Sequence, residues 1–295
     1  MPVSEDDRTP WGRDEALLAA RALLERAAAA ALPILVLGES GTGKERAARA
    51  AHAASGRASG PFVALNCGAI PDALIESELF GHARGAFTGA FVARAGLLEA
   101  ASGGTLFFDE VGDASALLQA KLLRVLADGT FRRVGETRER VADVRVVAAT
   151  HRDLEADVQA HRFREDLWYR LAAVEVRLPP LRARGSDVLW LAARFLSERV
   201  PGAEFDAAAK RALLAYAWPG NVRELEWAVA RAAMDTKADA SVPLSALPER
   251  MRAAVPATAR GLRAPRTPRA ARALHAHALA SEITSLEERR IREAL

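Results

Sequence analysis

The sequence lacks the features of a secreted or membrane protein. Its 295 residues include a single cysteine, Cys67, so no internal disulfide can form, which is typical of a reducing compartment. It contains no uncharged apolar run of about 20 residues, the length that a transmembrane helix needs. The first ten residues, MPVSEDDRTP, are acidic where a secretory signal is basic. We therefore expect a cytoplasmic protein without a membrane partner.

Lysine is also scarce, and arginine takes its place. Lysine occurs only at positions 44, 121, 210 and 237, whereas lysine and arginine together number 41 against 38 acidic residues. Because alanine is abundant too, we interpret the arginine excess as a compositional bias of the genome and not as evidence for nucleic-acid binding. Half of the residues are hydrophobic, which is enough for a substantial core.

Short apolar runs alternate with helical patterns in the first part of the chain. Helical periodicity predicts helices at 14–31, 45–54, 70–81 and 114–129. Buried strands are expected within 31–38, 61–67, 103–113 and 141–151. Strands that alternate with helices in this way predict an α/β fold with a parallel sheet covered by helices.

After about residue 178 the strand signal stops. Helical stretches at 189–200, 205–218 and 221–234 predict a small helical domain. From 241 onward proline, alanine and arginine mix without period, which is typical of a solvated linker, with non-specific DNA binding as the alternative. The expected parts are a short N-terminal segment (1–10), an α/β core (11–178), a helical domain (179–240), a linker (241–280) and the start of a C-terminal helix (281–295).

Residues 38–44, GESGTGK, match the phosphate-loop pattern GxxxxGK between an expected strand and an expected helix. Glycines let successive backbone amides point at phosphate oxygens, and the helix dipole adds positive potential. Lys44 would bring its charge to the β- and γ-phosphates of ATP. The alternative is a glycine-rich turn that only connects strand and helix. The expected nucleotide-binding residues here are Gly38, Glu39, Ser40, Gly41, Thr42, Gly43, Lys44 and Glu45.

Two carboxylates, Asp109 and Glu110, end the third expected strand. Ligands bind at the carboxyl edge of a parallel sheet, so Asp109 would position Mg²⁺ and Glu110 would polarise the attacking water. The alternative is an ordinary acidic strand end. Glu45 stands where a serine or threonine normally holds Mg²⁺, so that role must move, for instance to these acids through water. Asp113 is expected to cap the following helix.

Polar residues further along extend the expected site. Thr150 and His151 end the fourth strand, where a polar side chain can reach the γ-phosphate or the attacking water. Arg164 and Arg170 are six residues apart and would not share one helix face, so they make separate contacts. Arg223 opens a helix and could sense the γ-phosphate. The alternatives are a polar strand end for the first pair and surface ion pairs for the two arginines.

The segment GHARGAFTGA, residues 81–90, has no place in a nucleotide site. Gly85 and Gly89 bracket Ala86, Phe87 and Thr88, and glycine suits backbone with positive φ. A large apolar side chain on such a tip is either tucked into the core or offered to a partner.

Together these motifs resemble the AAA+ ATPase domain of bacterial enhancer-binding proteins, the NtrC-type activators of sigma-54 RNA polymerase. The resemblance covers about residues 11 to 240 and implies a three-layer α/β AAA+ P-loop domain with a parallel sheet, followed by a small all-helical lid. The segments that carry it are GESGTGKE (38–45), NCGAIPDALIESELFGHARGAFTGA (66–90), GGTLFFDEVGD (103–113), FRRVGE (131–136), VRVVAATHRDL (144–154), FREDLWYRL (163–171), LPPLRAR (178–184) and WPGNVREL (218–225).

The resemblance implies a ring, usually a hexamer, with ATP between subunits. Arg164 and Arg170 match the arginine-finger segment and would act on the neighbouring subunit's nucleotide. Arg223 matches the second sensor, and Thr150 and His151 match the first. The family normally has a glutamate after the lysine of the phosphate loop, as this chain does.

The resemblance also implies a mechanical role for the loop. Asn66 matches the residue that holds the catalytic glutamate, here Glu110, in a switch with the nucleotide state. In this family a loop of this sequence contacts sigma-54, so Phe87 and Thr88 would be exposed in order to bind it. The matching residues are Gly85, Ala86, Phe87, Thr88, Gly89 and Ala90. ATP hydrolysis would then remodel the closed promoter complex into the open one.

The chain departs from the family in two respects. Trp227 stands near a position where the family commonly has asparagine. The family also usually has a regulatory domain before the ATPase and a helix-turn-helix after it, whereas 281–295 resembles only the first helix of that DNA-binding domain. We expect either a shortened product or dependence on a partner for DNA targeting. The alternative functions are a nucleotide-controlled oligomeric DNA-associated regulator without sigma-54 remodelling, and another kind of AAA+ remodeller.

Overall fold

The structure, a computed structural model, describes residues 11–254. The expected segments 1–10, 255–280 and 281–295 lie outside the described residues, so the linker beyond 254 and the C-terminal helix stay predictions. Among the residues described, no helix is both long enough and apolar enough to span a bilayer.

A five-stranded parallel sheet forms the centre of the core, in the order β2-β5-β8-β1-β9. The strands are β1 (Ile34–Leu37), β2 (Phe62–Asn66), β5 (Thr105–Asp109), β8 (Arg145–Thr150) and β9 (Val174–Arg177). The four expected strands are confirmed, and β9 is an edge strand that the sequence analysis missed. Asn66 pairs with Asp109 across β2 and β5, and Leu37 pairs with Thr150 across β1 and β8. The strand ends that carry polar residues therefore meet at one edge.

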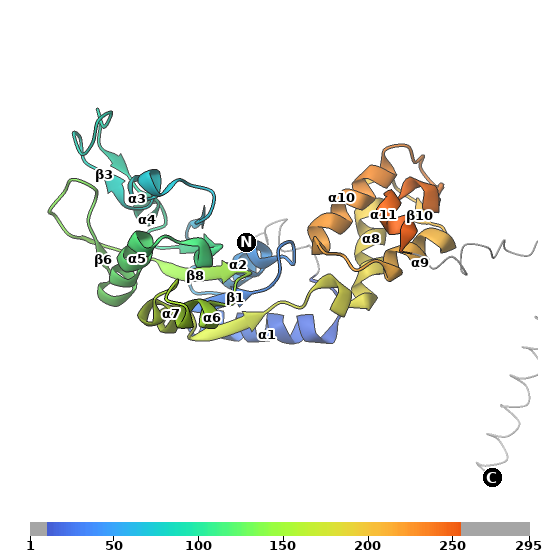
Figure 1. The fold of residues 1–295 in the computed structure, drawn as a ribbon, viewed down its shortest axis with the longest axis horizontal. Coiled ribbons are helices and arrows are strands. Elements are labelled where there is room, and N and C mark those ends of the chain that lie inside the picture. The colour runs from blue at the N-terminus through green and yellow to red at the C-terminus, as the bar shows by residue number, and fades with distance from the viewer. Residues whose placement is uncertain (1–10, 255–295) are drawn as a thin grey trace, which may run out of the picture. The chain divides into compact units, whose positions relative to one another are not determined.

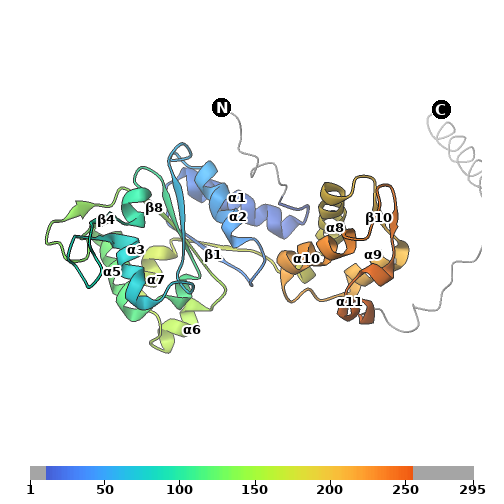
Figure 2. The ribbon, with the colours of Figure 1, turned by 90° about the horizontal axis from the view of Figure 1, so that it is seen from above.

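Alternate residues of each strand face opposite layers, as the period of a strand requires. In β5, Leu106 and Phe108 join one buried cluster, whereas Phe107 joins the other. Helices α1 (Glu15–Ala29) and α2 (Lys44–Ala53) contribute to the cluster that holds Phe107. The opposite layer contains α3 (Asp72–Phe80), α4 (Leu97–Ala100), α5 (Ala116–Asp128), α6 (Leu154–Gln159) and α7 (Glu165–Leu171). The core is thus the expected three-layer α/β sandwich (Figures 1 and 2).

Two short antiparallel pairs stand beside the sheet. Strand β3 (Gly81–His82) pairs with β4 (Arg94–Ala95), and β6 (Thr130–Phe131) pairs with β7 (Arg140–Val141). The loop between β3 and β4 contains the GAFTGA segment, and Gly135 of the β6–β7 loop lies against its Ala86.

The second part of the described chain is mainly helical. The three expected helices are confirmed as α8 (Gly185–Arg199), α9 (Ala207–Ala215) and α10 (Asn221–Ala233). The expected linker is wrong for residues 241–254, which form β11 (Ser241–Val242), a 3₁₀ turn and α11 (Glu249–Ala253). Val242 pairs with Phe205 of β10 (Glu204–Phe205), and both Val242 and Met251 are fully buried. These burials place 241–254 in the helical domain.

Candidate functional site

The phosphate loop, residues 38–43, connects β1 to the N-terminus of α2. Gly41 and Gly43 have φ of +78° and +103°, which favours glycine. A Cβ on Gly41 would also lie 2.3 Å from the carbonyl oxygen of Gly220, so no larger residue fits. Within the described residues no hydrogen bond engages the amide of Gly41 or Gly43. The loop therefore has the backbone conformation and the available amides of an anion cradle.

Three charged or polar side chains from different elements meet beside this loop. The ammonium of Lys44 is buried, 3.0 Å from the carbonyl oxygen of Gly38 and 3.1 Å from Oε1 of Glu110. Oε2 of Glu110 accepts a hydrogen bond from the amide of His151 at 3.1 Å and lies 2.7 Å from its Nδ1. Glu110 is therefore held between the phosphate-loop lysine and the end of β8.

The pKa values of the neighbouring carboxylates Asp109 and Glu110 are shifted in opposite directions. Burial raises the pKa of Asp109, and the charge of Glu110 raises it further. Burial also raises the pKa of Glu110, but hydrogen bonds from His151 and Lys44 outweigh it, so the net direction is down. Glu110 is thus ionised at neutral pH, as an acceptor of protons must be.

Asn66 lies beside Asp109, because these residues pair across β2 and β5. Its Nδ2 is 3.4 Å from Oδ2 of Asp109, and its Oδ1 accepts a hydrogen bond from the amide of Gly68 at 2.9 Å. In the part of the chain that the structure describes, Asn66 forms no hydrogen bond with Glu110, the partner that the sequence analysis expected. The switch between Asn66 and Glu110 stays a prediction.

Thr150 and His151, which were expected to act at the same site, have different partners in the structure. Thr150 is fully buried, and its hydroxyl accepts a hydrogen bond from the amide of Arg152 at 3.1 Å. Its carbonyl oxygen accepts from the amide of Gly38 at 3.3 Å, so Thr150 joins the ends of β1 and β8. His151, which is half exposed, is the member of the pair that reaches Glu110.

Asp113 was expected to cap α5, and this prediction is wrong. Ser115 is the cap, since its hydroxyl oxygen accepts a hydrogen bond from the amide of Leu118. A 3₁₀ turn, Val111–Asp113, precedes the cap residue. Asp113 instead accepts a hydrogen bond from Nη1 of Arg152 at 3.2 Å.

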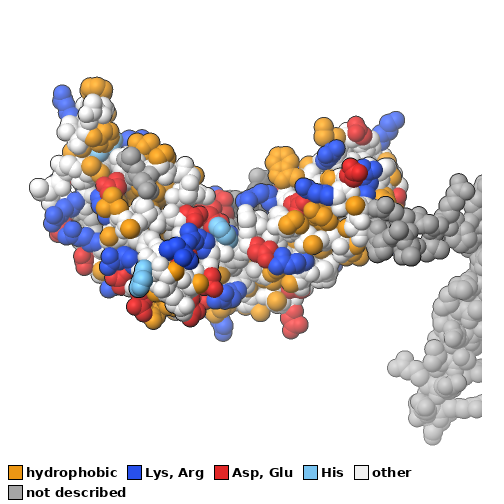
Figure 3. Space-filling view, viewed as in Figure 1, with side chains coloured by type: hydrophobic (Ala, Val, Ile, Leu, Met, Phe, Trp, Pro, Cys, Tyr) orange, Lys and Arg blue, Asp and Glu red, His pale blue; other side chains and the backbone are white. Residues whose placement is uncertain are grey.

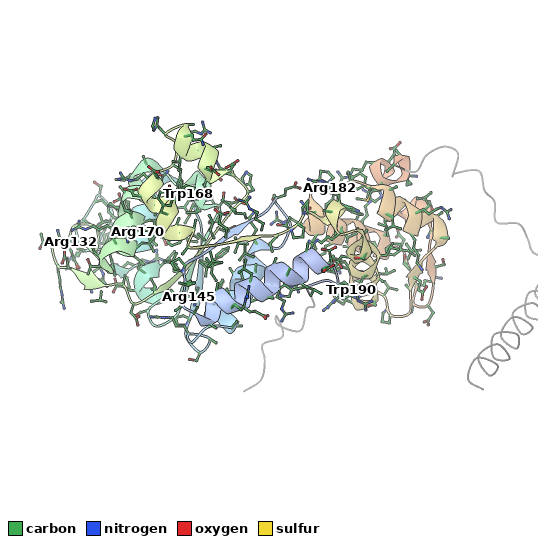
Figure 4. All side chains as sticks on the ribbon, turned by 90° about the horizontal axis from the view of Figure 1, so that it is seen from below. Arg132, Arg145, Trp168, Arg170, Arg182 and Trp190 are labelled. Atoms are coloured by element: carbon green, nitrogen blue, oxygen red, sulfur yellow. The ribbon has the colours of Figure 1, made fainter. Side chains whose placement is uncertain are left out.

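Residues of the helical domain contact the phosphate loop directly. Nδ2 of Asn221, which is fully buried, donates to the carbonyl oxygen of Ser40 at 3.0 Å and to Oε2 of Glu39 at 3.2 Å. Arg223 lies with Nη1 3.2 Å from the hydroxyl of Ser40. Arg182, labelled in Figure 4, donates from Nη1 to Oε2 of Glu39 at 2.8 Å. Asn221 and Arg182 were missed by the sequence analysis.

Three residues that were expected to bind nucleotide make contacts within the protein. The hydrogen bond from Arg182, with that from Asn221, lowers the pKa of Glu39 to about 2. Glu39 thus fastens the helical domain to the loop. Glu45 lies along α2, where Oε1 accepts a hydrogen bond from Arg49 at 2.7 Å. Thr42 donates from its hydroxyl to the carbonyl oxygen of Glu39 at 2.8 Å and so tightens the loop.

Arg164 and Arg170 make separate contacts, as their spacing predicts. Arg164 is the residue before α7, and its guanidinium is half exposed and pairs with Asp166 at 2.8 Å. Arg170 lies in the last turn of α7, with Nη1 3.5 Å from the carbonyl oxygen of Leu126. Across residues 11–254, neither side chain contacts the Lys44–Glu110 site of its own chain.

The GAFTGA segment forms a tight loop that leaves its aromatic side chain partly exposed. Gly85 and Gly89 have φ of +79° and +103°, and the amide of Gly85 donates to the carbonyl oxygen of Ala90 at 2.8 Å. Ala90 is buried and anchors the loop. The side chain of Phe87 remains 44 % exposed, although its ring and that of His82 meet edge to face, with 5.0 Å between centroids.

The apolar surface extends beyond the expected segment. Phe91 and Val92 are 82 % and 72 % exposed and follow the loop directly. Figure 3 shows hydrophobic side chains at the tip above β3, which Figure 1 labels. These two residues were not among those predicted from the sequence, although two apolar residues after a glycine-rich turn are a visible signal.

Comparisons with known proteins agree on one family. Residues 11–177 match the sigma-54 interaction domain, and 182–263 match the AAA+ ATPase lid domain. The hydrogenase transcriptional regulatory protein HoxA of Cupriavidus necator is 56 % identical over 206 residues, covering 68 % of this chain and 43 % of that protein. The Nif-specific regulatory protein of Azotobacter vinelandii is 54 % identical over 205 residues, covering 68 % of this chain and 39 % of that protein.

Solved structures agree with the fold. NtrX from Brucella abortus in complex with ADP is 37 % identical with a TM-score of 0.75, covering 82 % of this chain and 55 % of that chain. The complex of NtrX with ATP gives the same identity and TM-score, with coverage of 83 % and 58 %. The chain spans less than half the length of the two curated relatives named above.

Proposed function

This chain belongs to the sigma-54 interaction domain family and carries the AAA+ lid, and on that premise we propose that it hydrolyses ATP to convert the closed complex of sigma-54 RNA polymerase into the open complex. The observation that carries the proposal is the meeting of Lys44, Glu110 and His151 beside a phosphate loop. The same domain presents the half-exposed Phe87 on a glycine-bracketed loop.

The site suits a nucleoside triphosphate with Mg²⁺. The amides of Gly41 and Gly43 and the ammonium of Lys44 are donors for phosphate oxygens, and the ATP and ADP complexes of NtrX support this assignment. A magnesium ion held by one carboxylate and the phosphates would supply charge neutralisation, and Asp109 is the carboxylate placed for it. Because Glu45 is hydrogen-bonded to Arg49, water molecules would fill the remaining coordination positions of the magnesium ion.

Glu110 is the residue that orients and deprotonates the attacking water. Its lowered pKa keeps it ionised, and the hydrogen bond from His151 fixes one of its oxygens. When a phosphate group binds Lys44 in place of Glu110, Oε1 of Glu110 becomes free to bind the attacking water. His151 thereby links the position of Glu110 to the end of β8.

A second copy of the chain completes the site. Arg164 and Arg170 lie away from the Lys44–Glu110 site of their own chain, so they serve the nucleotide of a neighbouring subunit in a ring, which we propose to be hexameric. An arginine at the transferred phosphate stabilises the transition state, typically by about 10³- to 10⁵-fold in rate.

The loop transmits the work to sigma-54. A contact can shift an equilibrium only if its affinity differs between states, so the loop must move with the nucleotide state. Several copies of Phe87 and Thr88 in a ring give contacts that act together. Phe91 and Val92 extend the apolar surface offered to the partner.

The test is a pair of assays on one loop variant. Thr88→Ala should release phosphate from ATP at the wild-type rate and should fail to form open complexes at a sigma-54 promoter. Ser59→Ala, which removes an exposed hydroxyl in the turn before β2, is the matched control and should retain both activities. Normal open-complex formation by Thr88→Ala would show that the loop has another role.

A further inference from the structure

One buried side-chain amide joins the turn after Glu110 to the segment that carries Arg164. Gln119 of α5 is 2 % exposed. Its Nε2 donates to the carbonyl oxygen of Ala114 at 2.8 Å and to that of Arg162 at 3.1 Å. Its Oε1 accepts from the amide of Arg164 at 2.9 Å. A buried amide with partners on both ends fixes the geometry of the segments it joins, because each unmade bond would leave a polar group unsatisfied.

A chain of ion pairs runs between the same two segments. Asp157 of α6 is 4 % exposed, and its carboxylate accepts from Nε of Arg152 at 2.7 Å and from Nε of Arg162 at 2.8 Å. Nη1 of Arg152 also reaches Asp113 at 3.2 Å. The carboxylate turn is therefore linked to the Arg162–Arg164 segment along two routes, one through Gln119 and one through Asp157.

We propose that Gln119 is a positioning residue that sets Arg164 relative to Glu110 of the same chain. The turn after Glu110 keeps bonds of its own, since the amide of Asp113 donates to the carbonyl oxygen of Glu110 at 2.9 Å. The amide of Arg164 has Gln119 as its partner. Loss of Gln119 therefore releases Arg164 more than it disturbs Glu110.

This inference rests on the proposed function, because Arg164 acts there on a neighbouring copy. Gln119 then couples two nucleotide sites. A shift of residues 110–114 in one subunit moves Arg164 of the same subunit, which acts on the nucleotide of the next subunit. The coupling requires no contact between Gln119 and either nucleotide.

The test separates the two roles of a subunit by mixing full-length chains. A donor chain with Glu110→Ala supplies Arg164 but cannot hydrolyse its own ATP, and an acceptor chain with Arg164→Ala keeps Glu110 but supplies no finger. Phosphate release by the mixture reports the joint site. Gln119→Leu in the donor should lower this rate about 10- to 100-fold, since small misplacements of a catalytic group have effects of that order. The same substitution in the acceptor should leave the rate nearly unchanged.

Two further variants test whether the effect is specific to these contacts. Gln159→Leu, at the exposed glutamine of α6, should have no effect in either chain. Arg162→Ala, on a largely exposed side chain, removes the second route without opening the core and should lower the rate in the donor only. If Gln119→Leu misfolds, Gln119→Met, which fills a similar volume but has no amide to donate or accept these bonds, takes its place in donor and acceptor.

Equal losses in donor and acceptor, or no loss in the donor, would overturn the positioning role and leave the proposed function intact. A parent mixture that releases no phosphate, although each single variant binds ATP, would instead reject the shared site and the positioning role with it.

Discussion

The side-chain amide of Asn221 in the lid donates a 3.0 Å hydrogen bond to the carbonyl oxygen of Ser40 in the phosphate loop. Asn221 has φ of +51°, a conformation that glycine adopts without strain, so Asn221→Gly removes the amide and keeps the backbone. The substitution also removes the bonds of Asn221 to Glu39 and from the amide of Leu181. If the support lost by the phosphate loop equals that of one buried hydrogen bond, about 1.4 kcal/mol, ATP binding should be about tenfold weaker, measured with a fluorescent analogue. Asp239→Gly, another left-handed residue of the lid, is the control. Equal affinities for both variants would contradict the link.

Lys44 is expected to be essential for nucleotide binding. Its ammonium is buried and charged donors to phosphate are the strong ones, so Lys44→Ala should weaken ATP binding by at least about 100-fold, to below detection in a titration. Lys210→Ala, at a half-exposed lysine of the lid, should bind normally. Retained binding by the Lys44 variant would mean that the loop only connects β1 and α2.

Glu110→Ala should separate binding from hydrolysis. The variant keeps Lys44 and the loop amides, so it should bind ATP at least as well as the wild type. Without the base, phosphate release should fall about 10²- to 10⁴-fold. Glu25→Ala, at a partly exposed residue of α1, should hydrolyse normally. If Glu110→Ala still hydrolysed ATP at the wild-type rate, another residue would have to be the general base.

The pair of Glu39 and Arg182 predicts a pH-dependent contribution to stability. Arg182 and Asn221 hold the pKa of Glu39 at about 2, below its ordinary 4.5. The contribution is therefore present above pH 4.5 and is lost as the pH falls towards 2. Both charged side chains are nearly half exposed, so solvent screens the ion pair and keeps its contribution small.

Arg182→Ala checks this sign by urea denaturation. The free energy of unfolding should be slightly lower than that of the wild type at pH 7, and the difference should vanish near pH 2 if the protein remains folded there. A difference that grows on acidification would show that Arg182 acts on another group.

Much of the core followed from local patterns in the sequence. The strands β1, β2, β5 and β8 are short apolar runs, and their carboxyl ends carry the polar residues of the site. Strand β9 was missed because Glu175 and Arg177 interrupt its apolar pattern and only Val176 is fully buried. The phosphate loop and the two glycines of the GAFTGA segment were recognisable because a positive φ restricts the residue type.

The parts that sequence reasoning missed depend on contacts between distant residues. Residues 241–254 have the composition of a linker, yet Val242 and Met251 find buried positions in the lid. Asn221 is 181 residues from Ser40 along the chain, and Gln119 is 45 residues from Arg164. Neither periodicity nor a motif in the sequence predicts which residues a buried amide such as Gln119 contacts.

Capture of sigma-54 by the purified protein is the most direct measurement of the central claim. Sigma-54 should be retained when ADP with aluminium fluoride imitates the transition state, and should be released with ADP or without nucleotide. Phe87→Ala should abolish the capture and leave phosphate release intact. Equal retention of sigma-54 in all three nucleotide conditions would contradict the claim that ATP turnover drives the loop.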